Sequence, residues 1–164
     1  MISFLRIEKF VDAAAEKTNL AAAAGVAFIM FLTVADVIGR LFGSPIRGTY
    51  EIVGFVGAVI ISFALPYTSV KNGHIYVDIL MMKMPRMVRV VVYAVNALVS
   101  LILFGIITWQ SAVYAHSLKV SGEVSPTLQM PVYPFIYGVA LGCGMLCIVL
   151  LIEFLRQFRG AEIE

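Results

Sequence analysis

Charge is scarce in this sequence of 164 residues, and the shortage excludes whole classes of protein. Only 13% of the residues are Asp, Glu, Lys or Arg, whereas 61% are hydrophobic and the mean hydropathy is +0.96. A soluble domain of this size needs far more charge to cover its surface. The net charge of +2 is also too small to indicate a nucleic-acid-binding protein, so we expect no nucleic-acid partner.

Cysteine and histidine are scarce as well, which bears on metal and redox sites. Cys143 and Cys147 are one helical turn apart in an apolar segment, a spacing that favours buried thiols over a disulfide or a metal site. His74 and His116 both lie outside the predicted spans described next, which argues against haem ligation in the membrane. We therefore predict no catalytic residue, no cofactor and no metal site in this chain.

The hydrophobic residues are concentrated in four segments that are long enough to cross a membrane. A helix of about 20 residues crosses a hydrocarbon core of about 30 Å. The predicted spans are 20–38, 52–68, 88–108 and 133–154, and none of the 22 charged residues lies in the middle of one. The sequence thus predicts an all-α integral membrane protein, a four-helix bundle that forms a single domain over residues 1–164.

Two further segments are predicted to lie on the membrane surface as amphipathic helices. In 1–19, hydrophobic and charged residues alternate at helical spacing, and 69–87 carries an apolar stripe opposite polar residues. The stripe of the second segment consists of Ile75, Ile79 and Met82.

The basic residues are distributed unevenly between the connections. Eight of the 12 Lys and Arg residues lie in 1–19, 69–87 and 155–164, and Arg89, counted with the second of these segments, makes nine, whereas three lie in the connections 39–51 and 109–132. Short loops rich in Lys and Arg stay in the cytoplasm. Both termini are therefore predicted to be cytoplasmic, and the connections 39–51 and 109–132 are predicted to be periplasmic.

Charged residues cluster where the first span ends and the second begins. Asp36 and Arg40 are four residues apart, acid first, which is the favourable order for a helical ion pair. Glu51 opens the second span, where a carboxylate meets the positive end of the helix dipole, and Arg40 or Arg47 can pair with it. Two interpretations stay open. These residues form a docking cluster for a partner, or they only set the membrane topology and cap the helices.

Other polar and small residues suggest packing contacts. His74 and Asp78 share a helical face and form either a hydrogen-bonded pair or a contact to another subunit. Asn96 is the most polar residue near the middle of a span, where its amide is expected to form a hydrogen bond with a neighbouring helix. Gly138 and Gly142 form a GxxxG motif that brings a second backbone close, either within the bundle or in a partner.

The order of several short motifs resembles a known family. The chain closely resembles the small membrane subunit, DctQ type, of tripartite ATP-independent periplasmic (TRAP) transporters from about residue 35 to 151. The motifs that carry the resemblance are Arg40-Leu-Phe-Gly-Ser-Pro45, Thr49-Tyr-Glu51, Gly73-His-Ile-Tyr-Val-Asp78, Pro85 with Arg86 and Arg89, and Ser125-Pro-Thr-Leu-Gln-Met-Pro131.

The resemblance implies a scaffold role in the bacterial inner membrane. In such transporters a periplasmic substrate-binding protein delivers an organic acid to a large membrane subunit, which holds the substrate and sodium sites. The small subunit would pack against that large subunit, surrounded by membrane lipid. The candidate interface residues are Arg40, Arg47, Glu51, His74, Asp78, Lys119, Glu123, Gly138 and Gly142. The alternatives are an autonomous small transporter or channel, and a membrane-anchor subunit of an oxidoreductase.

Overall fold

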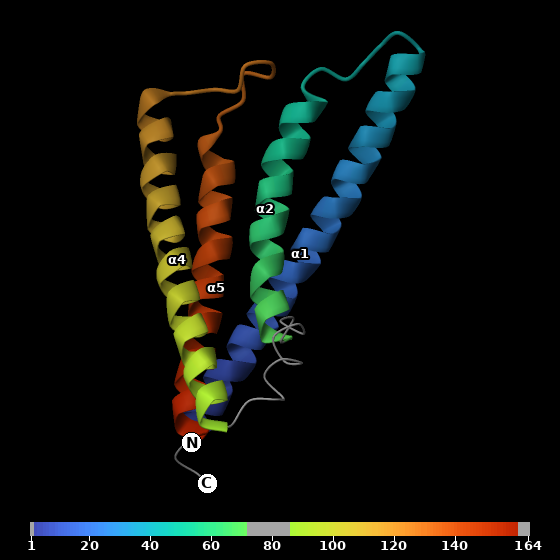
Figure 1. The fold of residues 1–164 in the computed structure, drawn as a ribbon. Helices are drawn as coiled ribbons and strands as arrows, with labels where there is room; N and C mark the ends of the chain where they lie inside the picture. Colours follow the sequence, from blue (N-terminus) through green and yellow to red (C-terminus); the bar gives the residue numbers. More distant parts are fainter. Residues whose placement is uncertain (1, 72–85, 161–164) are drawn as a thin grey trace.

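The described part of the chain consists of four long helices and their connections. A computed structural model describes residues 2–71 and 86–160 (Figure 1). The helices are α1 (Ile2–Leu41), α2 (Thr49–Val70), α4 (Arg86–Ser121) and α5 (Tyr133–Gly160). Each is long and apolar enough to cross a membrane. The prediction of an all-helical protein with four membrane-length helices is confirmed.

Helix α1 is continuous over 40 residues, although the sequence predicts a surface helix over 1–19 and a separate span over 20–38. Alanine-rich sequence at 13–15 and 21–24 surrounds the predicted boundary, and alanine is the best helix former. A helix of this length measures about 60 Å, roughly twice the thickness of the hydrocarbon core. The position of its first turns in the headgroup layer stays a prediction.

Helices α1 and α4 end in the same way, at a glycine in the left-handed conformation. Gly43 has φ 73° and Gly122 has φ 68°. The next residue after each glycine donates its backbone N–H back into the last turn: Ser44 to the Gly39 carbonyl at 2.8 Å, and Glu123 to the Leu118 carbonyl at 3.3 Å. This is the geometry of a Schellman cap. Helix α4 therefore continues to Ser121, well beyond residue 108, where the predicted third span ends.

The four helices form an open layer in the order α1, α2, α5, α4. Helix α2 packs between α1 and α5, and α5 packs between α2 and α4, whereas α1 meets α5 at few positions. In residues 2–71 and 86–160, α4 makes no comparable contact with α1 or α2. A four-helix bundle is predicted, but the described helices do not close around one shared core. Helix α5 presents small residues to both of its neighbours, Gly142 toward α2 and Gly144 toward α4, and so packs between them.

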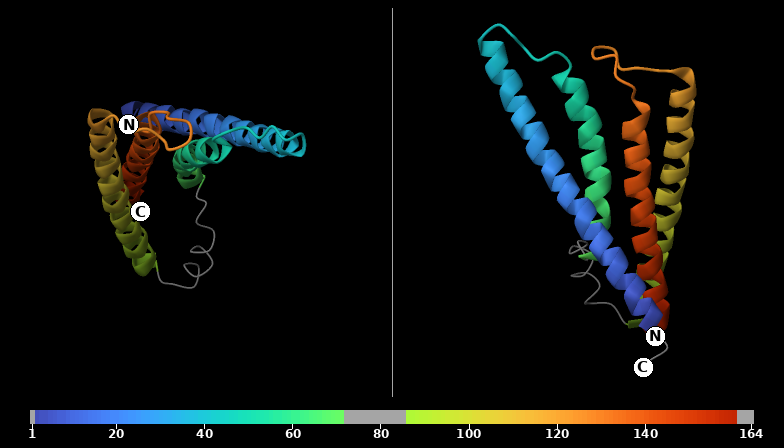
Figure 2. Two further views of the ribbon diagram at one scale, coloured as in Figure 1. Left: turned by 90° about the horizontal axis from the view of Figure 1, so that it is seen from above. Right: turned by 180° about the vertical axis from the view of Figure 1, so that it is seen from behind.

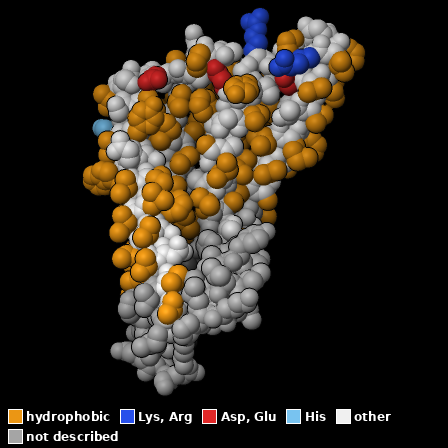
Figure 3. Space-filling model, viewed as in Figure 1, with side chains coloured by type: hydrophobic (Ala, Val, Ile, Leu, Met, Phe, Trp, Pro, Cys, Tyr) orange, Lys and Arg blue, Asp and Glu red, His pale blue; other side chains and the backbone are white. Residues whose placement is uncertain are grey.

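The two ends of the layer differ. Helix α1 begins and α5 finishes at the same end, which we call the terminal end (Figures 1 and 2). The connections 42–48 and 122–132 lie at the opposite end, which we call the loop end. Helix α1 passes close to α5 near the terminal end and diverges from it toward the loop end. Figure 3 shows hydrophobic side chains over the described face, with charged side chains gathered at the loop end.

Candidate docking site at the loop end

Asp36 attaches the first connection to α1. Its carboxylate accepts hydrogen bonds from the Arg40 Nε at 2.8 Å and from the Ile46 backbone N–H at 2.9 Å, and a second Arg40 nitrogen lies 2.8 Å away. The Asp36 side chain is only 7% exposed, whereas that of Arg40 is 65% exposed. The predicted helical ion pair is present, and the same carboxylate also fixes the 42–48 connection.

The second connection, 122–132, is folded on itself around Ser125. The Ser125 N–H donates to the Met130 carbonyl at 2.9 Å, and the Met130 N–H donates to the Ser125 hydroxyl oxygen at 3.3 Å. Val124 and Pro131 form an isolated antiparallel bridge across its base. Ser125 is only 1% exposed, so this connection has a small polar centre of its own.

Glu51 joins the two connections. One carboxylate oxygen accepts the Thr127 backbone N–H at 2.8 Å, and the other accepts the Leu128 N–H at 3.1 Å. The Leu128 side chain lies against Gly48, at the N-terminus of α2. A Cβ atom at position 48 would collide with that side chain, and Gly48 also has φ 78°, which favours glycine. We call these contacts between Gly48, Glu51 and residues 127–128 the loop joint.

The loop joint differs from the pairing that charge alone favours. The sequence suggests Arg40 or Arg47 as the partner of Glu51, but Arg40 pairs with Asp36. Within the described residues, Asp36–Arg40 is the only ion pair. The sequence indicates Lys119 and Glu123 as candidates on the second connection but does not reveal the contact of Leu128 with Gly48, because that contact depends on the conformation of both connections.

Three candidate interface residues keep their charge exposed at the loop end. Arg47, Lys119 and Glu123 are all exposed. Large apolar side chains lie near them in the sequence, among them Phe42 at 82% and Tyr50 at 92% exposure. A surface with a few accessible charges and scattered aromatic groups suits a transient protein contact, in which charge speeds the encounter.

The GxxxG motif is used within the chain. A Cβ atom on Gly142 would lie 2.6 Å from the backbone carbon and oxygen of Ser62, and one on Gly138 would lie 3.1 Å from a methyl group of Val59. Both glycines therefore face α2 of the same chain, which is the first of the two open interpretations. By contrast, a Cβ on Gly54 of α2 would meet nothing within 4 Å.

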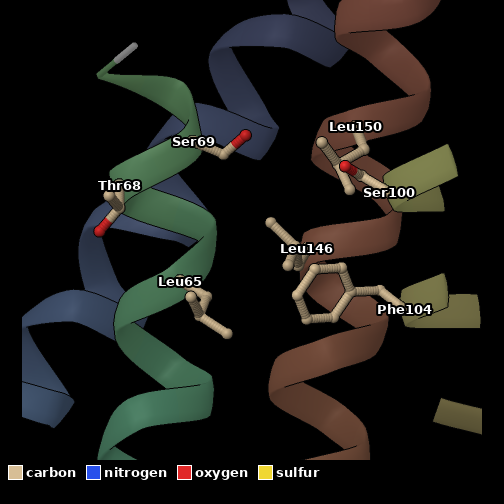
Figure 4. Close-up of a pocket in the computed structure, with 7 residues that line it drawn as sticks. All are labelled: Leu65, Thr68, Ser69, Ser100, Phe104, Leu146 and Leu150. Carbon is tan, nitrogen blue, oxygen red and sulfur yellow. The ribbon is translucent and has the colours of Figure 1, made fainter. Parts of the chain in front are cut away.

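Asn96 lies on the surface of α4. Its side chain is exposed, and no hydrogen bond joins its amide to another residue in the described parts of the chain. Near it, a cavity of about 150 Å³ opens between α2, α4 and α5 at their terminal halves (Figure 4). Apolar side chains and three hydroxyl-bearing residues line the cavity: Leu65, Thr68, Ser69, Ser100, Phe104, Leu146 and Leu150.

The remaining candidates concern histidine, cysteine and metal binding. His74 and Asp78 lie outside the described residues. Cys143 is buried, Cys147 is half-buried with its sulfur 3.9 Å from the Thr108 hydroxyl, and both are free thiols. Among the described residues no group of three or more His, Cys, Asp or Glu side chains could hold a metal ion.

Four apolar helices in an open layer, with their connections joined at one end, define a multi-pass helical membrane protein. The sequence matches the family described as "Tripartite ATP-independent periplasmic transporters, DctQ component" over residues 29–160. The chain therefore belongs to the family of small membrane subunits of TRAP transporters, and the resemblance is confirmed. No curated protein and no solved structure matches it.

Proposed function

We propose that this chain is the scaffold subunit of a sodium-coupled importer of organic acids in the bacterial inner membrane. Family membership supports a transport system of several components. The observation that carries the scaffold role is the contrast between the two parts of the structure. The helix layer offers apolar and small-residue faces, and the carboxylates that cross-link distant described segments, Asp36 and Glu51, lie at the loop end.

The layer offers open helix faces to a large membrane subunit. Among the described helices, α4 packs mainly on α5, and the face of α2 that carries Gly54 and Ala58 is exposed. Small residues at this spacing let another helix approach closely. Asn96 adds an amide that lipid tails cannot satisfy, because hydrocarbon offers no hydrogen-bond partner. We therefore propose that the large subunit packs against the exposed faces of α2 and α4 that carry these residues.

The loop end then receives the substrate-binding protein. If both termini are cytoplasmic, as the basic residues predict, the loop end faces the periplasm. Arg47, Lys119 and Glu123 are the exposed charges there that the described contacts leave available. Arg40 is mostly committed to Asp36, and Glu51 to the loop joint.

Reconstitution tests this function. We expect sodium-driven uptake of an organic acid only when proteoliposomes contain both membrane subunits and are supplied with the binding protein. Omitting this chain should abolish uptake, and this chain alone should transport nothing. Uptake by this chain alone would instead establish an autonomous carrier, and haem absorbance in the purified chain would favour an oxidoreductase anchor.

A further inference from the structure

Both oxygens of the Glu51 carboxylate are occupied inside the chain. They accept the consecutive N–H groups of Thr127 and Leu128, at 2.8 and 3.1 Å. Glu51 is 76 residues away from Thr127 in sequence, so the bonds close a long loop between α2 and the 122–132 connection. The Glu51 carboxylate therefore binds the 122–132 connection through both of its oxygens.

The loop joint has a second, independent contact. The Leu128 side chain fills the space over Gly48, directly beside the backbone that precedes α2. Asp36 binds Ile46, two residues before Gly48, and thereby ties the same stretch to α1. The chain of contacts runs from α1 through the 42–48 connection and the N-terminus of α2 to the 122–132 connection. The two connections therefore form one unit.

We infer that Glu51 is a positioning residue for docking of the substrate-binding protein: it holds the 122–132 connection against α2 and so fixes the spacing between the charges of the two connections, Arg47 and Glu123. The inference rests on the proposed function. A surface that is already ordered loses less conformational freedom when a partner binds, so the joint raises docking affinity without touching the partner.

Two substitutions at Glu51 separate positioning from direct contact. Glu51→Asp keeps the negative charge but is one methylene shorter, so it cannot reach both N–H groups. Glu51→Gln keeps the length but replaces one acceptor oxygen with an NH₂ group. A direct charge contact would tolerate Asp and not Gln, whereas the joint is weakened by both. Glu16→Gln is the matched control, because it removes one exposed acidic charge from α1, near the terminal end.

The assay uses the complete transporter in proteoliposomes with increasing concentrations of binding protein. For both Glu51 variants we expect the half-maximal concentration to rise about three- to ten-fold, with unchanged uptake at saturation. Glu16→Gln should give the same half-maximal concentration of binding protein as the wild type. Amide hydrogen exchange of the 122–132 peptide should be faster in both Glu51 variants, even when no binding protein is present.

A glycine pair tests the joint without changing Glu51. Gly48 and Gly43 both have positive φ, 78° and 73°, but a Cβ on Gly48 collides with Leu128 whereas one on Gly43 meets nothing within 4 Å. Both alanine variants carry the same kind of backbone strain, so their difference reports the collision. Gly48→Ala should raise the half-maximal concentration more than Gly43→Ala does. This pair also decides the question if a Glu51 variant fails to assemble.

The outcomes distinguish the inference from the function on which it rests. If uptake by the wild-type complex does not depend on the binding protein, the proposed function is overturned and the inference with it. If uptake depends on the binding protein but Glu51→Asp has the same half-maximal concentration as the wild type, the inference alone is overturned. Equal effects of Gly48→Ala and Gly43→Ala would likewise contradict it.

Discussion

The helix layer and the loop end use polar groups in opposite ways. In the layer, hydroxyl groups bond to the carbonyls of their own helix: Ser62 to Val59 at 2.8 Å and Thr108 to Phe104 at 2.8 Å. At the loop end, the Asp36 and Glu51 carboxylates bond to backbone N–H groups of connections 10 and 76–77 residues away. The layer is therefore held by close packing, and the loop end by charged hydrogen bonds.

This difference follows from the surroundings of each part. Lipid tails are as apolar as the side chains, so helices associate through close packing of small residues. At the membrane surface, charged groups can be placed at lower cost, and they can order irregular backbone that has no helix of its own. Substitutions in the layer should consequently change assembly, and substitutions at the loop end should change docking.

The largest effect on stability is expected at the interface between α2 and α5. Gly142→Leu places a bulky side chain where even a Cβ would lie 2.6 Å from the Ser62 backbone, so the two helices must separate. We expect the free energy of unfolding to fall by more than about 1–3 kcal/mol, which is the usual cost of overpacking. The melting temperature of the purified chain should fall with it.

Gly144→Ala is the control on the same helix. A Cβ at position 144 lies at an ordinary 3.6 Å from Thr108, so the melting temperature should change little or rise slightly. Equal melting temperatures for Gly142→Leu and the wild type would show that α2 and α5 do not meet at Gly142.

A smaller effect, on docking alone, is expected from charge reversal at the loop end. Arg47→Glu should raise the half-maximal concentration of binding protein at low salt, and the difference should shrink as salt rises. Arg40→Glu should instead lower the yield of folded complex, because Arg40 pairs with Asp36. If Arg47→Glu has no effect at either salt concentration, Arg47 does not belong to the docking surface.

The smallest effect is expected at Asn96. If its amide meets the large subunit, Asn96→Leu should weaken association by about 0.6 kcal/mol, the average for such a hydrogen bond in membranes. Val95→Leu, at the neighbouring exposed position, is the control and should leave association unchanged. Unchanged association with Asn96→Leu would instead place this face of α4 in lipid.

The sequence indicated how many long helices the described chain has, but neither all of their ends nor their contacts. Apolar length alone indicated four membrane-length helices, because crossing hydrocarbon needs about 20 apolar residues. It could not place the end of α4: residues 109–121 are polar enough to read as a loop, yet they contain no proline or glycine and stay helical as far as Gly122. The continuity of α1 was missed for a similar reason.

The loop joint shows why contacts are harder to predict than helices. Charge alone suggests that Glu51 pairs with the nearest arginines, but its carboxylate binds backbone N–H groups instead. Every residue except proline has a backbone N–H group, so no sequence motif marks the ones that Glu51 binds. The GxxxG motif correctly indicated a close helix contact at Gly142. That its partner is Ser62 of α2 depends on the arrangement of the helices.

Site-specific photo-crosslinking in the assembled transporter tests the division between the two regions most directly. A photoreactive residue at Arg47 should cross-link to the substrate-binding protein, and one at Asn96 should cross-link to the large membrane subunit. The reverse pattern, or cross-linking of position 47 to the large subunit alone, would contradict the assignment of docking to the loop end and of assembly to the helix layer.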